Sequence, residues 1–144
     1  MQVQTILKAK GEGGVVTVAP GTRVAEAAQI LAERRIGALI VSADGRHMAG
    51  IVSERDIVRE LGRRGAMCLS LAVDDIMTRE IVGCTRADSL DQVMERMTEG
   101  RFRHMPVLEG AEMVGLISIG DVVKARLGEL AMEKEALTGM IMGN

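Results

Sequence analysis

One pattern of apolar and turn-forming residues occurs twice in this chain of 144 residues. The β-branched run Val15-Val16-Thr17-Val18 corresponds to Ile81-Val82-Gly83-Cys84, and the apolar positions that follow coincide in the two copies. Further on, Gly50-Ile-Val-Ser-Glu-Arg-Asp56 corresponds to Gly115-Leu-Ile-Ser-Ile-Gly-Asp121, with the glycine, serine and aspartate identical. An internal duplication of this kind predicts two similar structural units that pack together.

Each copy opens with a predicted strand and an amphipathic helix. The strands cover residues 15–18 and 81–84. Thr22 and Asp88 follow turn residues and are typical N-caps of a helix. Apolar residues then recur at i, i+3, i+4 and i+7, which places them on one helix face that packs on a core. These residues are Val24, Ala27, Ala28 and Leu31 in the first copy, and Leu90, Val93, Met94 and Met97 in the second.

A hairpin and a second helix complete each copy. The predicted strand pairs are residues 36–41 with 47–52 and residues 103–108 with 113–117, joined by turns that contain glycine. One helix starts after Ser53 and ends near Gly62. The other starts after Ser118 and continues to the end of the sequence, with Gly128 as the expected place for a break. The order β-α-β-β-α, found twice, predicts a mixed α/β (α+β) fold.

Composition and charge argue against several classes of function. The net charge of −2 and the single phenylalanine give neither a basic footprint nor a stacking platform for nucleic acid. The first residues lack the apolar core of a signal peptide, and no apolar run is long enough to cross a bilayer. Two isolated cysteines suggest neither a disulfide nor a metal site. We therefore expect a cytoplasmic protein with no nucleic-acid or membrane partner. The two histidines suggest no nucleophile and base, so we expect no enzyme.

The repeated Ser-x-x-Asp motif has two interpretations. As a capping box, the serine and the aspartate would only satisfy free backbone groups at the start of a helix. As a ligand site, the helix N-terminus would favour a phosphate, and Asp56 or Asp121 would accept hydrogen bonds from both hydroxyls of a ribose. Recurrence of the motif, each time after a glycine at a fixed distance, favours the ligand site, although both interpretations can hold in different ligand states.

The repeated plan that ends in Gly-φ-φ-Ser-x-x-Asp resembles the CBS domain, over about residues 15–130. Residues 98–107 and 118–127 are similar to those of small stand-alone bacterial CBS-pair proteins. The resemblance implies two repeats packed about a pseudo-twofold axis, with no catalytic activity. It divides the chain into an N-terminal segment or linker (1–14), a first CBS domain (15–67), a second CBS domain (74–128) and a helical C-terminal tail (129–144). It also implies that an adenine nucleotide, AMP, ADP, ATP or NAD(H), or S-adenosylmethionine, binds in clefts between the repeats.

The resemblance also supplies the candidate binding residues, which differ between the two copies. Thr17 would contact the adenine or ribose, or else be an ordinary strand residue; Gly83 takes its place in the second copy. Arg103 and His104, which a solvated edge would also explain, are expected on opposite faces of a regular strand, with Arg103 holding the phosphate. The two clefts should therefore bind differently. The candidate residues are Thr17, Ile36, Gly37, Ala38, Ser53, Arg55, Asp56, Arg101, Phe102, Arg103, His104, Pro106, Ser118, Gly120 and Asp121.

A second hypothesis is a protein-interaction module with vestigial clefts that docks to an enzyme or transporter. The C-terminal segment contains many exposed apolar candidates, including several methionines, which adapt to irregular surfaces. We prefer the interpretation in which this segment closes a homodimer. The apolar candidates are Leu127, Leu130, Met132, Leu137, Met140 and Met142.

Overall fold

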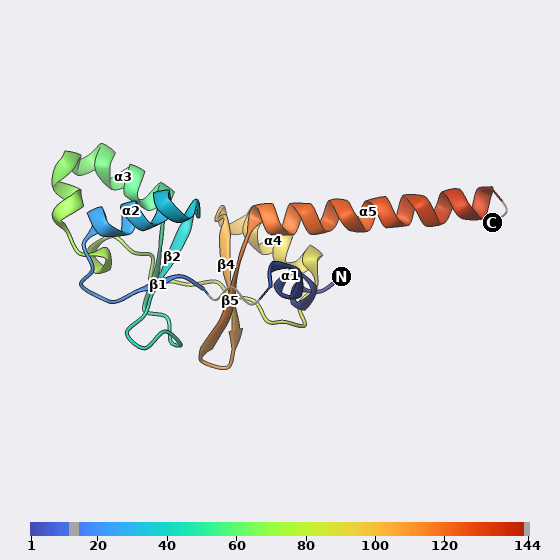
Figure 1. The fold of residues 1–144 in the computed structure, drawn as a ribbon, viewed down its shortest axis with the longest axis horizontal. Helices are drawn as coiled ribbons and strands as arrows, with labels where there is room; N and C mark the ends of the chain where they lie inside the picture. Colours follow the sequence, from blue (N-terminus) through green and yellow to red (C-terminus); the bar gives the residue numbers. More distant parts are fainter. Residues whose placement is uncertain (12–14, 143–144) are drawn as a thin grey trace.

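The protein consists of two similar halves arranged side by side along its long axis (Figure 1). The computed structural model describes residues 1–11 and 15–142. The first half contains β1 (Thr17–Val18), α2 (Val24–Arg34), β2 (Ala38–Val41), β3 (Gly50–Ser53) and α3 (Glu54–Arg64). The second contains α4 (Leu90–Gly100), β4 (His104–Glu109), β5 (Glu112–Ser118) and α5 (Ile119–Ile141). The remaining elements are α1 (Val3–Lys10) and the 3₁₀ turns η1 (Gly65–Ser70) and η2 (Val73–Asp75).

The two sheets confirm the predicted mixed fold and correct one strand. In the first half, β1 pairs parallel with β2, which pairs antiparallel with β3. In the second half, β4 and β5 form an antiparallel pair, but residues 81–84 form no strand. Only Cys84 bridges Val107, which is the counterpart of the Val18–Val41 pair in β1 and β2. Gly83, which has no side chain to pack on the sheet, stands where the first half has Thr17.

The predicted helix boundaries need four corrections. The N-caps are Arg23 and Ser89, because the side chains of Thr22 and Asp88 instead stabilise the turns before the helices. Ser89 forms a capping box with Gln92. The third helix continues past Gly62 to Arg64, and α5 continues without a break past Gly128. A single glycine lowers helix stability by about 1 kcal/mol, which neighbouring turns tolerate.

Each half has its own hydrophobic core. The first core lies between α2, β2, β3, η2 and residues 76–77. The second lies between α4, β4 and β5, and it includes Val3 and Ile6 from α1. No helix was expected within residues 1–14, yet α1 contributes buried side chains to the second core. The Gly11–Gly14 run, interpreted as a linker, falls mostly outside the described residues.

The segment that precedes each repeat packs on the other repeat. Residue Val73 donates its N–H to Thr22 O (2.7 Å), and Val3 donates in the same way to Asp88 O (2.9 Å). Thr22 and Asp88 are equivalent positions, so residues 71–77 and residues 1–7 play the same part in the two halves. This exchange of leading segments joins the halves with pseudo-twofold symmetry.

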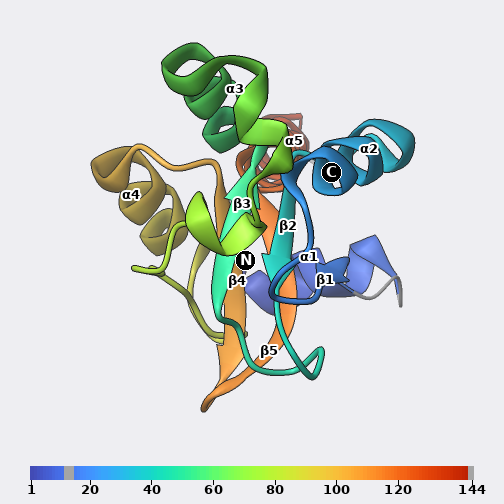
Figure 2. The same ribbon diagram turned by 90° about the vertical axis from the view of Figure 1, so that its left-hand side faces the viewer.

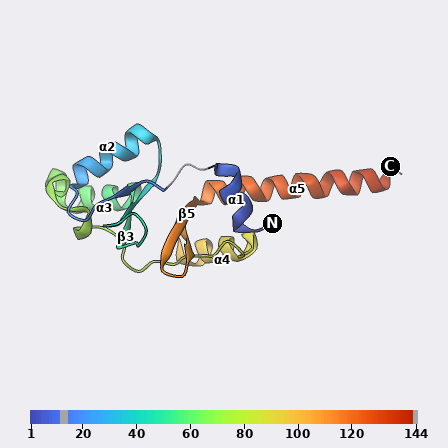
Figure 3. The same ribbon diagram turned by 60° about the horizontal axis from the view of Figure 1, so that its bottom comes forward.

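Helix α5 begins within the second half and then leaves it. Viewed end-on, α1 and α4 lie on opposite sides of the strands (Figure 2). Both contact the first part of α5, and its last part reaches beyond them (Figure 3). In the part of the chain that the structure describes, neither α5 nor any other helix is long and apolar enough to span a membrane.

Candidate functional site

Two clefts lie between the halves, and both are within the size range of small-molecule sites. Cleft I has a volume of about 460 Å³, and cleft II has a volume of about 700 Å³. Cleft I is lined by Leu7, Lys10, Gly11, Val15, Val16, Arg35, Ile36, Gly37, Ala38, His104, Val114, Gly115, Leu116, Ser118 and Asp121. Cleft II is lined by Gly37, Ile51, Ser53, Glu54, Arg55, Asp56, Arg59, Thr78, Glu80, Ile81, Val82, Gly100, Arg101, Phe102, Arg103, His104 and Pro106.

The two clefts have equivalent linings, with the roles of the two repeats exchanged. Cleft I combines residues 15–16 and 35–38 of the first repeat with Ser118 and Asp121 of the second. Cleft II combines residues 81–82 and 101–104 of the second repeat with Ser53 and Asp56 of the first. Each Ser-x-x-Asp motif therefore faces the other repeat's loop.

Both Ser-x-x-Asp motifs form capping boxes. The Asp56 N–H donates to Ser53 Oγ (3.2 Å), and the Ser53 N–H donates to Asp56 Oδ2 (2.8 Å). The Asp121 N–H donates to Ser118 Oγ (3.1 Å), and the Ser118 N–H donates to Asp121 Oδ2 (2.8 Å). The capping interpretation is thus confirmed. It uses Oδ2 of each aspartate, and the structure gives Oδ1 of Asp121 no partner among the described residues.

Each of the two aspartates is also paired with a cation. Arg59, one turn along the same helix, donates to Asp56 Oδ1 (3.0 Å). Lys10, from α1, donates to Asp121 Oδ2 (2.8 Å). Burial alone would raise the pKa of Asp121, but the hydrogen bonds from Lys10 and Ser118 outweigh it and hold the pKa below its usual range. Asp121 is therefore ionised at neutral pH.

The loops before β2 and β4 are each fixed by the start of a helix. In the first half the Glu54 N–H donates to Gly37 O (2.9 Å), and in the second the Ile119 N–H donates to Arg103 O (2.8 Å). A Cβ added at Gly37 would lie 3.0 Å from the His104 ring, so this imidazole fills the space beside Gly37. Both residues line both clefts and separate them. Burial lowers the pKa of His104, although Glu54 and Asp121 oppose this effect.

Arg35 and Arg101 occupy equivalent positions at the C-caps of α2 and α4. Both have a left-handed backbone, with φ of 55°. Glycine is the usual residue in this conformation because a Cβ makes it less favourable. Arg35 lines cleft I and Arg101 lines cleft II, so both non-glycine residues that the structure describes in this conformation lie beside a cleft.

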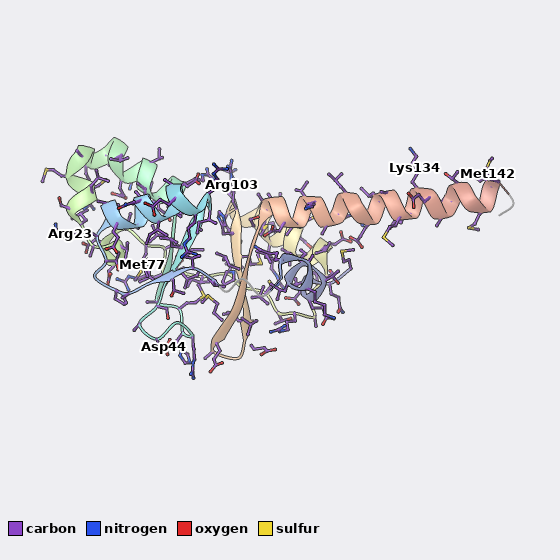
Figure 4. The ribbon with its side chains drawn as sticks, in the orientation of Figure 1. Arg23, Asp44, Met77, Arg103, Lys134 and Met142 are labelled. Atoms are coloured by element: carbon purple, nitrogen blue, oxygen red, sulfur yellow. The ribbon has the colours of Figure 1, made fainter. Side chains whose placement is uncertain are left out.

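The structure corrects the expected separation of Arg103 and His104. Both line cleft II, and His104 also reaches cleft I. Strand β4 begins at His104, so Arg103 lies in the preceding bend, where strand alternation does not apply. Figure 4 shows Arg103 where the two halves face each other. Two candidates, Thr17 and Gly120, line neither cleft.

The comparisons with known proteins identify the family. The sequence model of the CBS domain matches residues 13–63 and 73–128. The chain belongs to the CBS domain family. It is 33% identical over 148 residues to the mitochondrial CBS domain-containing protein CBSX3 of Arabidopsis thaliana, covering 98% of this chain and 72% of that protein.

Two solved CBS structures resemble this CBS pair closely. A CBS-domain containing protein from Agrobacterium tumefaciens has a TM-score of 0.83 and 44% identity, covering 88% of this chain and 99% of that one. A CBS domain protein from Pyrobaculum aerophilum, complexed with AMP, has a TM-score of 0.77 and 26% identity, covering 92% of this chain and 99% of that one. These likenesses confirm a tandem CBS pair.

The CBS pair also contains cleft residues that were not predicted from the sequence. Lys10 and Leu7 come from the unpredicted helix α1, and Arg59 follows Asp56 by one turn. The internal repeat could have predicted that residues 81–82 and 15–16 have the same role. Residues 81–82 line cleft II, and their counterparts 15–16 line cleft I. Nothing in the local sequence indicates Lys10, whose partner is 111 positions away.

The glycine before each Ser-x-x-Asp motif has a packing explanation. A Cβ at Gly50 would lie 2.5 Å from Met77 Sδ and 2.9 Å from Thr78 O. A Cβ at Gly115 would lie 2.6 Å from Leu7 Cδ2. The glycines thus admit the leading segments of the two repeats. Their fixed distance from the motif is explained without a ligand, so it no longer favours a ligand site over a cap.

Proposed function

We propose that this CBS pair is a non-catalytic regulatory module that binds an adenine nucleotide in cleft II. One observation carries the choice of cleft: the position that Gly37 fills in cleft I is filled by Arg103 in cleft II. Arg103 faces the N-terminus of α3, where Ser53 and Asp56 lie. The AMP complex of the Pyrobaculum aerophilum relative supports the ligand class.

The residues of cleft II suit the three parts of a nucleotide. Ile51, Ile81, Val82 and Pro106 provide apolar surface for a base. Asp56 would take the two ribose hydroxyls once Arg59, whose side chain is 44% exposed, turns aside.

The phosphate would lie between Arg103, Arg101 and Arg55, near the N-terminus of α3, where the helix dipole favours an anion. Glu54 and Glu80 also line the cleft and limit how much negative charge it accepts. We therefore propose AMP before ATP or NAD(H). We further propose a cytoplasmic location.

A thermal-shift panel tests this function. We expect AMP at about a hundred times its Kd to add about 2.7 kcal/mol to the free energy of unfolding. Asp56→Asn should remove most of that gain, because the single amide oxygen accepts the Ser53 N–H and leaves an NH2 group, which accepts no hydrogen bond, facing the ribose. Asp121→Asn is the matched control in cleft I and should retain the gain.

If AMP, ADP, ATP, NADH and S-adenosylmethionine all leave the melting temperature unchanged at millimolar concentration, the nucleotide function is wrong. The alternative is an interaction module that docks to an enzyme or transporter. The observation that favours this alternative is the exposed apolar surface of α5, including Leu127, Leu137 and Ile141. Asp56→Asn would then have no effect on the partner's binding.

A further inference from the structure

Lys10 lies at the point in cleft I where a ribose would bind. Its ammonium group donates to Asp121 Oδ2 (2.8 Å) and to Leu116 O (3.0 Å). Both acceptors belong to the second repeat, around the turn into α5. Lys10 thus ties the C-terminal end of α1 to the carboxylate that corresponds to Asp56 of cleft II.

Arg59 and Lys10, the cations that pair with the two aspartates, come from different kinds of element. Arg59 belongs to the same helix as Asp56 and can turn into solvent without moving another element. Lys10 makes two hydrogen bonds, and both tie the last turn of α1 to the second repeat. Beyond that turn, residues 15 and 16 form a wall of the same cleft. Displacing Lys10 therefore breaks hydrogen bonds between α1, which lines cleft I, and the second repeat, whereas displacing Arg59 breaks contacts within α3 only.

We propose that Lys10 is an intramolecular competitor for cleft I. Its ammonium occupies the carboxylate of Asp121, so a nucleoside enters cleft I only by displacing Lys10 and releasing the end of α1. The same nucleotide then fills cleft II first. Occupation of cleft I changes the contacts of the end of α1. This inference rests on the proposed function, because it assumes that the aspartate of each cleft is the ribose acceptor.

The side chain of Lys10 is 42% exposed, so its substitution leaves the core intact. The test is calorimetric titration of adenosine and AMP into Lys10→Met, in a background of Asp56→Asn and Arg103→Ala that weakens cleft II. Lys8→Met is the matched control, because Lys8 is an exposed lysine on the same helix. We expect Lys10→Met to raise the affinity for adenosine at least tenfold, and Lys8→Met to leave it unchanged.

Three results would overturn the competitor role. Adenosine affinity could be equal in Lys10→Met and Lys8→Met, or adenosine could fail to bind Lys10→Met at all. AMP binding could also weaken in Lys10→Met with adenosine unchanged, which would make Lys10 a phosphate ligand. Failure of the proposed function is distinguishable, since AMP would then not bind the protein that carries intact cleft II. Hydrogen exchange at residues 7–11 should increase when adenosine fills cleft I.

Discussion

At the scale of single residues, the positive charge that cleft II offers to a phosphate comes from arginine. Burial lowers the pKa of His104 from its ordinary value of 6.5, so the imidazole is neutral at pH 7 to 8. A guanidinium stays charged throughout this range and can bind a phosphate with two hydrogen bonds. Arg103 and His104 share cleft II, but of these two residues only Arg103 is charged at pH 7 to 8.

We expect Arg103→Ala to weaken AMP binding by about 1.5–3 kcal/mol, the range for charge-assisted hydrogen bonds. The Kd for adenosine should change by less than about twofold. Calorimetric titration at pH 8 measures both. An equal loss for AMP and adenosine would mean that Arg103 shapes the pocket and does not hold the phosphate.

The pH dependence separates the contribution of His104. A bound phosphate raises the pKa of His104 from its lowered value, so binding takes up a proton and AMP affinity increases as pH falls from 8 toward 6. His104→Gln should match wild type at pH 8 and lack this increase. The comparison cancels the titration of AMP itself, because both proteins receive the same ligand. A large loss in His104→Gln at pH 8 would contradict a neutral His104.

At the scale of elements, the sequence predicted those parts of the fold that repeat locally. The helices after Ser53 and Ser118 and both hairpins follow from periodicity and turn residues. The leading segments were missed because their partners lie far along the chain. Val3, Ile6 and Leu7 show helical spacing that could have indicated α1. The contact of Leu7 with Gly115 has no such local signal.

The candidate site divides in the same way. Ser53, Asp56, Ser118 and Asp121 were predicted, and the structure places one pair in each cleft. The prediction that Arg103 and His104 lie on opposite faces of one strand was wrong. The start of β4 depends on the pairing of His104 with Ser118. Strand boundaries set by such long-range hydrogen bonds are not visible in a local pattern.

The glycines that admit the leading segments give the element-scale prediction. We expect Gly50→Ala to lower the free energy of unfolding by about 1–3 kcal/mol, because the added methyl group meets backbone as well as Met77. Gly115→Ala should cost less, since Leu7 can change rotamer. Gly62→Ala is the control: it lies within α3 with nothing within 4 Å, and should stabilise by up to about 1 kcal/mol. Urea denaturation measures all three, and wild-type stability for Gly50→Ala would contradict the packing role.

At the scale of the whole molecule, α5 presents an uncovered apolar stripe. Val123, Leu127, Leu130, Leu137 and Ile141 are exposed and follow the alternating spacing of four and three residues that coiled coils use. Lys134 occupies the one remaining position of the stripe, and Figure 4 shows it pointing away from the rest of the second half. A second copy of α5 has the matching stripe, which favours self-association.

Charges on α5 favour an antiparallel pair of helices. A parallel pair in register would place Lys134 against Lys134 of the second copy inside the seam, where like charges are costly. An antiparallel pair avoids this contact. Lys134 then sets the register at some cost in stability.

We therefore expect a homodimer with twice the 15.4 kDa mass of the chain. Leu130→Glu should convert it to a monomer, because Leu130 lies at the centre of the stripe and a carboxylate there would have to be buried in the seam. Met132→Glu is the matched control. Met132 is 66% exposed but lies on the opposite side of α5, so this variant should remain a dimer. Light scattering at low micromolar concentration measures the mass. A monomeric wild type, or a dimer that survives Leu130→Glu, would show that α5 does not form the contact between copies.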